Sequence, residues 1–378
     1  MAISDNLDRK LREWFDAGII DVATAEKIRS FESARESTGV RWPVVLAVVF
    51  GAVMMAAGVL LFVAAHWDNL SPTQRFLLVL AMVAGFHLAA GAIMPRMRAL
   101  GLALHAVGTV SLGAGIFLSG QIFNLEEHWP GGILLWAIGA ALSWAVLRDW
   151  PQATLAALLV PAWIASEWSV RTEHYRNPET LLLQFLTLLA LTYLSAYFGT
   201  RKSAFRSSLA WVGGIALLPM SGILAVTSEE HWFPPLTRPF PVGIHAAGIL
   251  MAFVLPFLAA WLLRGRAAAW NVAFGVWVFA FGLLHGKDPV MRLLVYALCA
   301  LGAIGLALWG LREERRERIN LGIAGFAITV IAFYFSTVMD KLGRSAALVG
   351  LGLLFLLGGW KLEQLRRKLV ARTVGGSR

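Results

Sequence analysis

The chain contains almost no cysteine and few charged residues. Cys299 is the single cysteine among 378 residues, which excludes an intramolecular disulfide and a cysteine-based metal site. Charged residues make up 15% of the chain, whereas ordinary soluble domains carry about 25%. The hydrophobic fraction is 58%. This balance places the chain among membrane proteins and outside the class of soluble globular proteins.

Long uncharged runs account for the low fraction of charged residues. Residues 44–65 contain no charged side chain, and a helix of that length crosses the hydrocarbon layer of about 30 Å. A hydrophilic stretch of about 40 residues precedes this run, whereas a signal peptide places its apolar region close behind a basic start. We therefore expect a membrane-spanning helix here and no secretion signal.

The apolar runs predict an all-α polytopic bundle of about twelve transmembrane helices. The expected spans are 43–65, 76–94, 99–120, 131–147, 151–167, 180–199, 207–227, 242–263, 267–284, 289–310, 319–338 and 345–360. Eleven or thirteen spans are the alternatives, because the segment 131–169 is interrupted by Arg148-Asp149-Trp150-Pro151. Three regions follow from this assignment: a hydrophilic head (1–42), the transmembrane domain (43–361) and a basic tail (362–378).

The distribution of basic residues predicts the orientation. With twelve spans, 25 of the 33 Lys and Arg residues fall on the side of the two termini and 8 on the other. The positive-inside rule then places both termini in the cytoplasm of a bacterium, with the chain in its inner membrane. The net charge of +10 is explained by topology, so the lipid bilayer is the expected partner and nucleic acid is not.

The head is predicted to form an amphipathic helical hairpin. Leu11, Trp14 and Phe15 recur at helical spacing, Gly18 interrupts the pattern, and Asp21 is suited to cap a second helix. Two helices of this length bury little by themselves. A protein partner for the hairpin is therefore one expectation, and a self-contained cap without a partner is the other. The oligomeric state does not follow from the sequence.

Three His-Trp pairs stand where apolar runs end, at residues 66–67, 128–129 and 231–232. The composition predicts about 0.3 such pairs by chance, so three indicate internal repetition. The second and third pairs share the string Glu-Glu-His-Trp, 103 residues apart. These registers favour repeating units of four helices with the same topology. All three pairs fall on the predicted outer side.

Polar side chains form two candidate sets. The centres of the predicted spans lack charged residues, so the candidate intramembrane polar residues are His87, His105, Gln184 and Asn271. A lone intramembrane histidine is more often an interhelical hydrogen-bond partner than a proton relay. The candidate outer-face cluster comprises His66, Asp68, Gln121, Glu126, Glu127, His128, Glu230, His231 and His245.

The outer cluster has two interpretations. Imidazole and carboxylate groups bind zinc or perform acid–base catalysis, but no His-x-x-x-His or His-Glu-x-x-His spacing occurs, so separate loops would have to assemble a site. The alternative is that the rings mark the membrane interface. We expect no metal and no cofactor. The charged run 312–318 is interpreted as a solvated loop.

The N-terminal part is similar to a known family. The hairpin sequence from Leu11 to Ile20, the span ending at Ala65-His66-Trp67-Asp68-Asn69-Leu70 and the exit Gly120 to Leu125 carry the similarity. Over about residues 5–150 the chain resembles bacterial predicted membrane proteins grouped as domain of unknown function 2157. The resemblance implies a prokaryotic polytopic membrane protein with a small cytoplasmic head, and no activity or catalytic residues.

Three classes of function fit these observations. Transport of a small solute is the leading interpretation, because it fits the number of spans and the repeat, although the missing intramembrane carboxylates count against ion coupling. A non-catalytic envelope scaffold or signalling protein would act through its head. An enzyme acting on a lipid-linked substrate would use the outer His and Glu residues.

Overall fold

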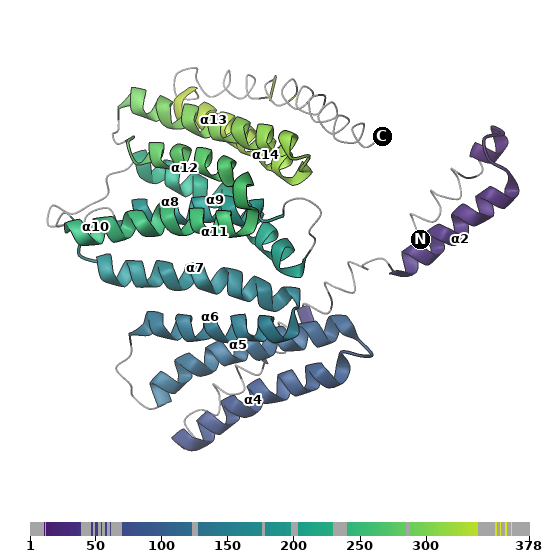
Figure 1. The fold of residues 1–378 in the computed structure, drawn as a ribbon, viewed down its shortest axis with the longest axis horizontal. Coiled ribbons are helices and arrows are strands. Elements are labelled where there is room, and N and C mark those ends of the chain that lie inside the picture. The colour runs from purple at the N-terminus through teal and green to yellow at the C-terminus, as the bar shows by residue number, and fades with distance from the viewer. Residues whose placement is uncertain are drawn as a thin grey trace. The chain divides into compact units, whose positions relative to one another are not determined.

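A computed structural model provides the fold. It describes residues 13–38, 70–122, 128–175, 178–197, 203–229, 240–284 and 288–338, with Leu11 and scattered positions within 47–61 and 352–364. The elements in order are α2 (Val22–Thr38), α4 (Pro72–Ile93), α5 (Arg98–Ile122), α6 (Trp129–Leu147), α7 (Trp150–Thr172), α8 (Pro178–Ser195), α9 (Ala204–Glu229), α10 (Val242–Ile249), η2 (Leu250–Val254), α11 (Leu255–Arg264), η3 (Gly265–Ala268), α12 (Ala269–Phe281), α13 (Pro289–Arg312), α14 (Arg316–Phe333) and η4 (Tyr334–Val338). The predicted all-α fold is confirmed (Figure 1).

The helices follow the apolar runs closely. Among the described residues, nine helices are long and apolar enough to cross a membrane. The longest of these continuous segments, Val242–Phe281, has 40 residues. It contains two of the predicted spans, because Gly265 adopts a φ of 60° between α11 and α12. That left-handed conformation suits glycine and turns the chain back. The predicted spans 43–65 and 345–360 lie largely outside the described residues.

The interruption at residues 148–151 separates two helices. Arg148 ends α6 in the left-handed conformation with a φ of 54°. Asp149 then caps α7, its carboxylate accepting from the backbone N–H of Gln152 at 3.1 Å, and Pro151 occupies the first turn. An aspartate before a first-turn proline is a typical helix start. The segment 131–169 therefore contributes two helices that pack against each other.

The chain divides into two compact units. The first comprises residues 1–70 and 86–107, and the second comprises residues 71–85 and 108–378. Within the first unit, Gly18 takes a φ of 67° and Asp21 caps α2 by accepting from the N–H of Thr24 at 2.8 Å. Hydrogen bonds from Thr24 hold the pKa of Asp21 below its ordinary value. The turn and the cap agree with the sequence-based prediction.

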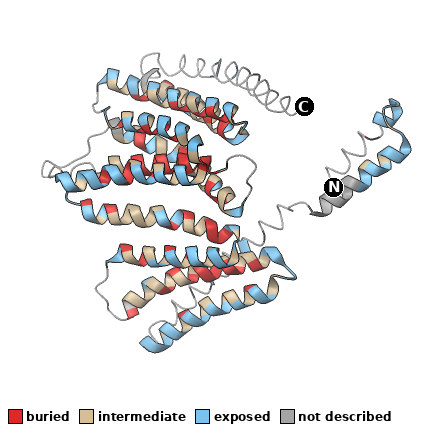
Figure 2. Ribbon diagram, in the orientation of Figure 1, coloured by how far each residue is buried: buried red, intermediate tan, exposed pale blue. Residues whose placement is uncertain are grey.

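Helix α8 is the centre of the second unit. Its Leu188, Leu191 and Leu194 are almost completely buried, and α7, α9, α10, α11 and α12 contact it. Residues of α9, α12 and α13 complete the core around it. Figure 2 shows this concentration of buried residues, with exposed positions on the outer helices. The helix most enclosed by its neighbours is the one that carries Gln184.

Glycines bring neighbouring helices into backbone contact. A Cβ on Gly213 would lie 2.4 Å from the carbonyl oxygen of Ala190, so α9 approaches the backbone of α8. A Cβ on Gly322 would lie 2.6 Å from the carbonyl oxygen of Ala303, so α14 approaches α13 in the same way. Because lipid is as apolar as a helix surface, close packing through small residues is a main source of helix association in membranes.

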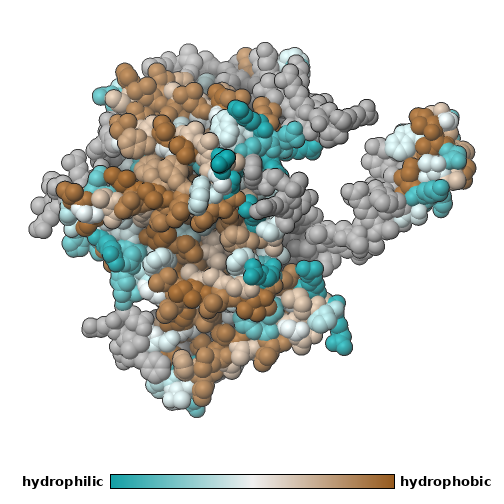
Figure 3. Space-filling model, in the orientation of Figure 1, coloured by the Kyte–Doolittle hydropathy of each residue, from teal (hydrophilic) through white to brown (hydrophobic). Residues whose placement is uncertain are grey.

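Apolar side chains cover the outside of the second unit. Val146, Trp211 and Val276 are 80%, 68% and 67% exposed, and Figure 3 shows hydrophobic surface across the helices. Surfaces of this kind on soluble proteins are small. In a protein with nine described membrane-length helices, this surface is suited to lipid.

Candidate functional site

His87 and His105 meet in the first unit. Their Nδ1 atoms lie 2.9 Å apart, with His105 6% exposed and His87 half-buried. At this distance one ring donates and the other accepts, so at least one imidazole is neutral. The described residues contain no group of three or more His, Cys, Asp or Glu side chains that could hold a metal ion. The pair is an interhelical hydrogen bond between α4 and α5.

Gln184 and Asn271 lie in the second unit at different depths. Asn271 is fully buried in α12 and donates to Ser195 Oγ, near the end of α8, at 3.1 Å. Gln184 lies near the beginning of α8 and donates to the carbonyl oxygen of Val278 at 3.3 Å. Gln184 and Ser195 are eleven residues apart on α8, which corresponds to about 16 Å along the helix axis. The hydrogen bonds of Gln184 and Asn271 therefore lie at different depths.

Most of the predicted outer cluster lies outside the described residues. This applies to His66, Asp68, Glu126, Glu127, Glu230 and His231, and to the side chain of Gln121. Both alternatives for this cluster, a site assembled from separate loops and rings that mark the membrane interface, therefore stay open for His66 and His231. His128 and His245 are described and exposed, and each contacts a different group of residues.

His128 binds a carboxylate that the sequence did not single out as functional. Its Nε2 lies 2.6 Å from Glu167 Oε2, and Arg171 Nε donates to the other carboxylate oxygen at 2.6 Å. Helix α7 extends to Thr172, beyond the predicted end at residue 167. Glu167 and Arg171 are thus one helical turn apart on one face. That i,i+4 spacing was the signal available in the sequence.

A groove lies beside this ion pair, between α7 and α10. It has a volume of about 570 Å³ and is lined by Glu167 and Arg171 at its polar part, and otherwise by Trp163, Ile164, Trp168, Gly243, Ile244, Ala247 and Met251. Trp168 is fixed because its indole N–H donates to the carbonyl oxygen of Pro178 at 2.8 Å. The groove combines one ionic part with aromatic and aliphatic walls.

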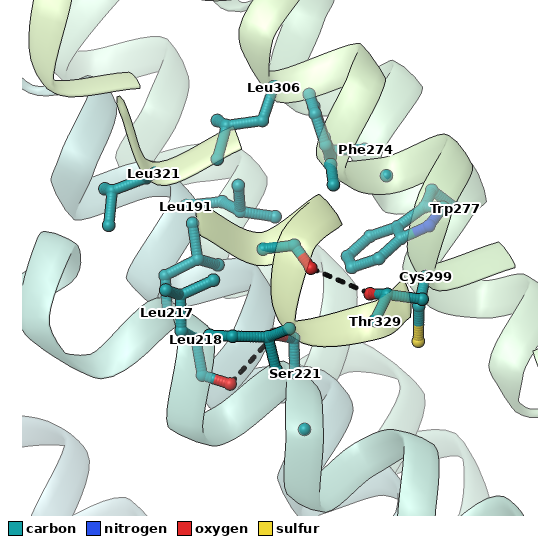
Figure 4. A pocket seen from close by; sticks show the side chains of 15 residues that line it. Leu191, Leu217, Leu218, Ser221, Phe274, Trp277, Cys299, Leu306, Leu321 and Thr329 are labelled. Carbon is teal, nitrogen blue, oxygen red and sulfur yellow. Dashed lines mark hydrogen bonds between the residues drawn. The ribbon is translucent and has the colours of Figure 1, made fainter. Parts of the chain in front are cut away.

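A small pocket lies among α8, α9, α12, α13 and α14. It measures about 100 Å³, and Figure 4 shows mainly leucine, phenylalanine and tryptophan side chains around it. Two hydroxyl groups line it, but Ser221 donates to the carbonyl oxygen of Leu218 at 3.1 Å and Thr329 donates to that of Gly325 at 2.8 Å. Both are bonded within their own helices, so the pocket is apolar.

An ion network occupies the end of the second unit opposite the α7–α10 groove. Glu313 accepts from Arg264, from Arg318 Nη1 at 2.6 Å and from the Trp309 indole N–H at 2.6 Å. Both arginine side chains are 0% exposed, and their guanidinium carbons lie 5.2 and 4.5 Å from the Trp309 ring centroid. Arg264 also donates to the carbonyl oxygen of Ser195 at 2.8 Å.

The network changes the titration of Glu313 and corrects one prediction. Burial alone would raise the pKa of Glu313, but the hydrogen bond from Arg264 and the charge of Arg318 outweigh it and hold this pKa below its ordinary value. The interpretation of residues 312–318 as a solvated loop was wrong for Glu313 and Arg318. The charge pattern of residues 312–318 does not reveal that helices far away in the sequence pack around Glu313 and Arg318.

Comparison with known proteins supports the membrane assignment. No curated protein and no solved structure matches the chain. Residues 12–153 match the model of a family described as predicted membrane protein. The resemblance found in the sequence is thereby confirmed, and the N-terminal part of this chain, residues 12–153, matches the predicted membrane proteins of domain of unknown function 2157.

Proposed function

We propose that the second unit binds a phosphate-bearing lipid in the groove between α7 and α10. The observation that carries the proposal is the arrangement of the groove, in which the Glu167–Arg171 pair adjoins walls formed by Trp163, Ile244 and Met251. Acyl chains would lie along the apolar walls, and the phosphate would meet the ionic part. Its volume of about 570 Å³ is within the usual range of ligand sites.

Arg171 is the expected phosphate ligand. Glu167 engages its Nε and Nη2 atoms, each at 2.6 Å, and the arginine side chain is 72% exposed. A guanidinium has five N–H donors in a planar fork, so donors remain for a phosphate oxygen. Glu167 orients this fork, and His128 adds a second positive charge to the same carboxylate when its imidazole is protonated.

The distribution of basic residues supports an outer-leaflet position for this groove. The beginning of α6, the end of α7 and the beginning of α10 adjoin segments that carry few basic residues. Under the positive-inside rule, this distribution supports an exoplasmic position for these segments in a bacterial inner membrane and a cytoplasmic position for both termini. A lipid or lipid-linked phosphate of the outer leaflet is therefore the proposed ligand.

The described interior gives no comparable support for transport of a small solute. A permease with this many spans was the leading sequence-based expectation, and it requires a polar path. The pocket of about 100 Å³ is lined mainly by apolar side chains, and Asn271 is fully buried and bonded to Ser195. Catalysis on a lipid-linked substrate keeps one supporting contact, the orientation of the His128 imidazole by Glu167.

Native mass spectrometry of the full-length protein released from lipid nanodiscs tests the proposal. Phosphatidylglycerol is compared with diacylglycerol of the same acyl chains, for the wild type, Arg171→Gln and Ile244→Trp. Arg266→Gln is the matched control, because Arg266 is exposed on a different element, η3.

A charge near a lipid headgroup contributes about 1 kcal/mol, so Arg171→Gln should lower phosphatidylglycerol occupancy about fivefold. Ile244→Trp should exclude the acyl chains, and Arg266→Gln should have no effect. Equal binding of phosphatidylglycerol and diacylglycerol, or wild-type binding by Arg171→Gln, would overturn the proposal.

A further inference from the structure

A second pocket lies on the other side of α10, between α8 and α12. It has a volume of about 360 Å³, and its apolar walls include Phe240, Ile249, Phe253, Phe279 and Leu283. Phe253 and Phe279 fix one another edge to face, with ring centroids 5.9 Å apart. The pocket is therefore lined mainly by apolar side chains, three of them phenylalanine, as is usual for sites that bind small molecules.

Gln184 presents an unsatisfied acceptor to this pocket. The residue is 3% exposed and lines the pocket, and its amide nitrogen donates to the carbonyl oxygen of Val278 at 3.3 Å. Its Oε1 accepts no hydrogen bond from any described residue. Gln184 Oε1 is not one of the buried side-chain atoms that lack a partner among the described residues, so this acceptor is open to the pocket. A ligand that donates an O–H or N–H could therefore reach it.

Two further polar side chains line the same pocket. Thr180 lies one helical turn before Gln184 on α8, and His245 lies on α10. The His245 ring centroid is 6.2 Å from that of Phe240. Among the described residues that line the pocket, none is Asp, Glu, Lys or Arg. An amide carbonyl, a hydroxyl and an imidazole favour a neutral ligand with several hydrogen-bonding groups.

The helix that separates the pocket from the α7–α10 groove contains an irregular turn. Residues Leu250–Val254 form a π-helical turn, in which the N–H of Leu255 bonds to the carbonyl oxygen of Leu250. Pro256 follows and has no N–H to continue regular α-helical bonding. Single π-turns within helices are frequent at functional sites. Here the turn carries Phe253, which is part of the pocket wall.

We propose that this pocket binds a neutral, hydroxyl-rich ring, a sugar or polyol, with a ligand hydroxyl donating to Gln184 Oε1. The other hydroxyls would bond to Thr180 and His245, and the apolar face of the ring would lie against the phenylalanine side chains. The ring has two sources, a free sugar or the headgroup of a glycolipid. This site is distinct from the phosphate groove and does not depend on Arg171.

Two substitutions perturb the acceptor in different ways. Gln184→Leu removes both hydrogen-bonding groups. Gly282→Ala keeps the glutamine but adds a Cβ that would lie 2.7 Å from Gln184 Nε2, so the amide must turn away. Gly282 has a φ of −67°, which alanine adopts readily. Ser221→Ala is the matched control, because Ser221 lines the separate pocket of about 100 Å³ and bonds within its own helix.

Binding is measured on the full-length protein in nanodiscs. Saturation-transfer NMR tests methyl glucoside, methyl galactoside, methyl mannoside and myo-inositol as free rings, and native mass spectrometry compares monoglucosyl diacylglycerol with diacylglycerol. Helix content from circular dichroism confirms that each variant is folded. Loss of one neutral hydrogen bond should weaken binding by about tenfold in Gln184→Leu and Gly282→Ala.

The binding results distinguish a free sugar from a glycolipid headgroup, and they distinguish this pocket from the phosphate groove. Binding of a free ring identifies a soluble sugar, and binding of the glycolipid alone identifies a headgroup. Arg171→Gln should leave either signal unchanged, so failure of the phosphate groove and failure of this pocket are distinguishable. The proposal is overturned if no member of either panel binds, or if Gly282→Ala binds as tightly as the wild type.

Discussion

Replacing Glu313 by glutamine should unfold the second unit at markedly lower denaturant concentrations. Glutamine keeps the shape of the side chain but removes the negative charge between Arg264 and Arg318, whose side chains are 0% exposed. Arg264 would retain the carbonyl oxygen of Ser195 at 2.8 Å. Arg318 would retain that of Tyr197 at 3.4 Å. The larger part of the cost therefore falls on Arg318.

Breaking a buried ion pair by removing one partner costs about 3–5 kcal/mol, because a charge remains buried without compensation. The Glu313 side chain is 12% exposed and Arg264 keeps a carbonyl partner, so we expect a loss near 3 kcal/mol. The assay is unfolding by dodecyl sulfate in mixed micelles, followed by far-ultraviolet circular dichroism. Glu314→Gln is the control, because Glu314 is adjacent and exposed.

The same variant predicts a pH dependence. The pKa of folded Glu313 is held below the ordinary value of 4.5. The stabilisation that the ionised carboxylate gives to the folded state is therefore fully present above pH 4.5 and is lost as the pH falls through the folded-state pKa. The difference in stability between wild type and Glu313→Gln should narrow over that interval. Equal unfolding of Glu313→Gln and Glu314→Gln at neutral pH would refute this account of the network.

Three further predictions concern other contacts. His87→Phe and His105→Phe should each lower stability by about 1 kcal/mol, and the double variant should cost less than the sum, because both remove the same hydrogen bond; additive losses in the dodecyl sulfate assay would contradict the contact. Gly322→Ala should destabilise the protein, because the added Cβ would lie 2.6 Å from a carbonyl oxygen of α13. Gly222→Ala has open space around the added Cβ and should be neutral or stabilising. The measurement is thermal unfolding in detergent, and equal unfolding midpoints for the two variants would exclude close α13–α14 packing. A phosphatase that is active only outside the cytoplasm should be inactive when fused after residue 378, and activity there would overturn the predicted orientation.

The sequence predicted the helices well because membrane spans are determined by local composition. Each expected span from 76–94 to 319–338 has a helical counterpart. At the interruption near Asp149 a new helix begins, because the Asp149 carboxylate caps it. Side-chain partners depend on which helices become neighbours, and periodicity contains no such information. Gln184 and His245 were both candidates, for example, but their position in one pocket follows from the packing of α8 against α10.

Glu167 and Glu313 show a second limit of sequence reasoning. Both lie at helix ends, where carboxylates are ordinarily solvated, and neither was singled out as functional. Their roles depend on arginines: Arg171 lies one turn away, but Arg264 is 49 residues distant. A charged residue at the edge of a span is therefore ambiguous until its counter-ion is known.

The ion network also constrains the order of folding. Synthesis proceeds from the N-terminus, so Arg264 emerges 49 residues before Glu313, and Tyr197 emerges 121 residues before Arg318. Helices α13 and α14 are joined by three residues and close a short loop at little entropic cost. The contact of Glu313 with Arg264 requires α13 alone, whereas the contact of Arg318 with Tyr197 also requires α14. A chain that stalls before α14 would therefore contain both Arg264 and Glu313 but lack Arg318, so the Glu313 carboxylate would have one of its two guanidinium partners.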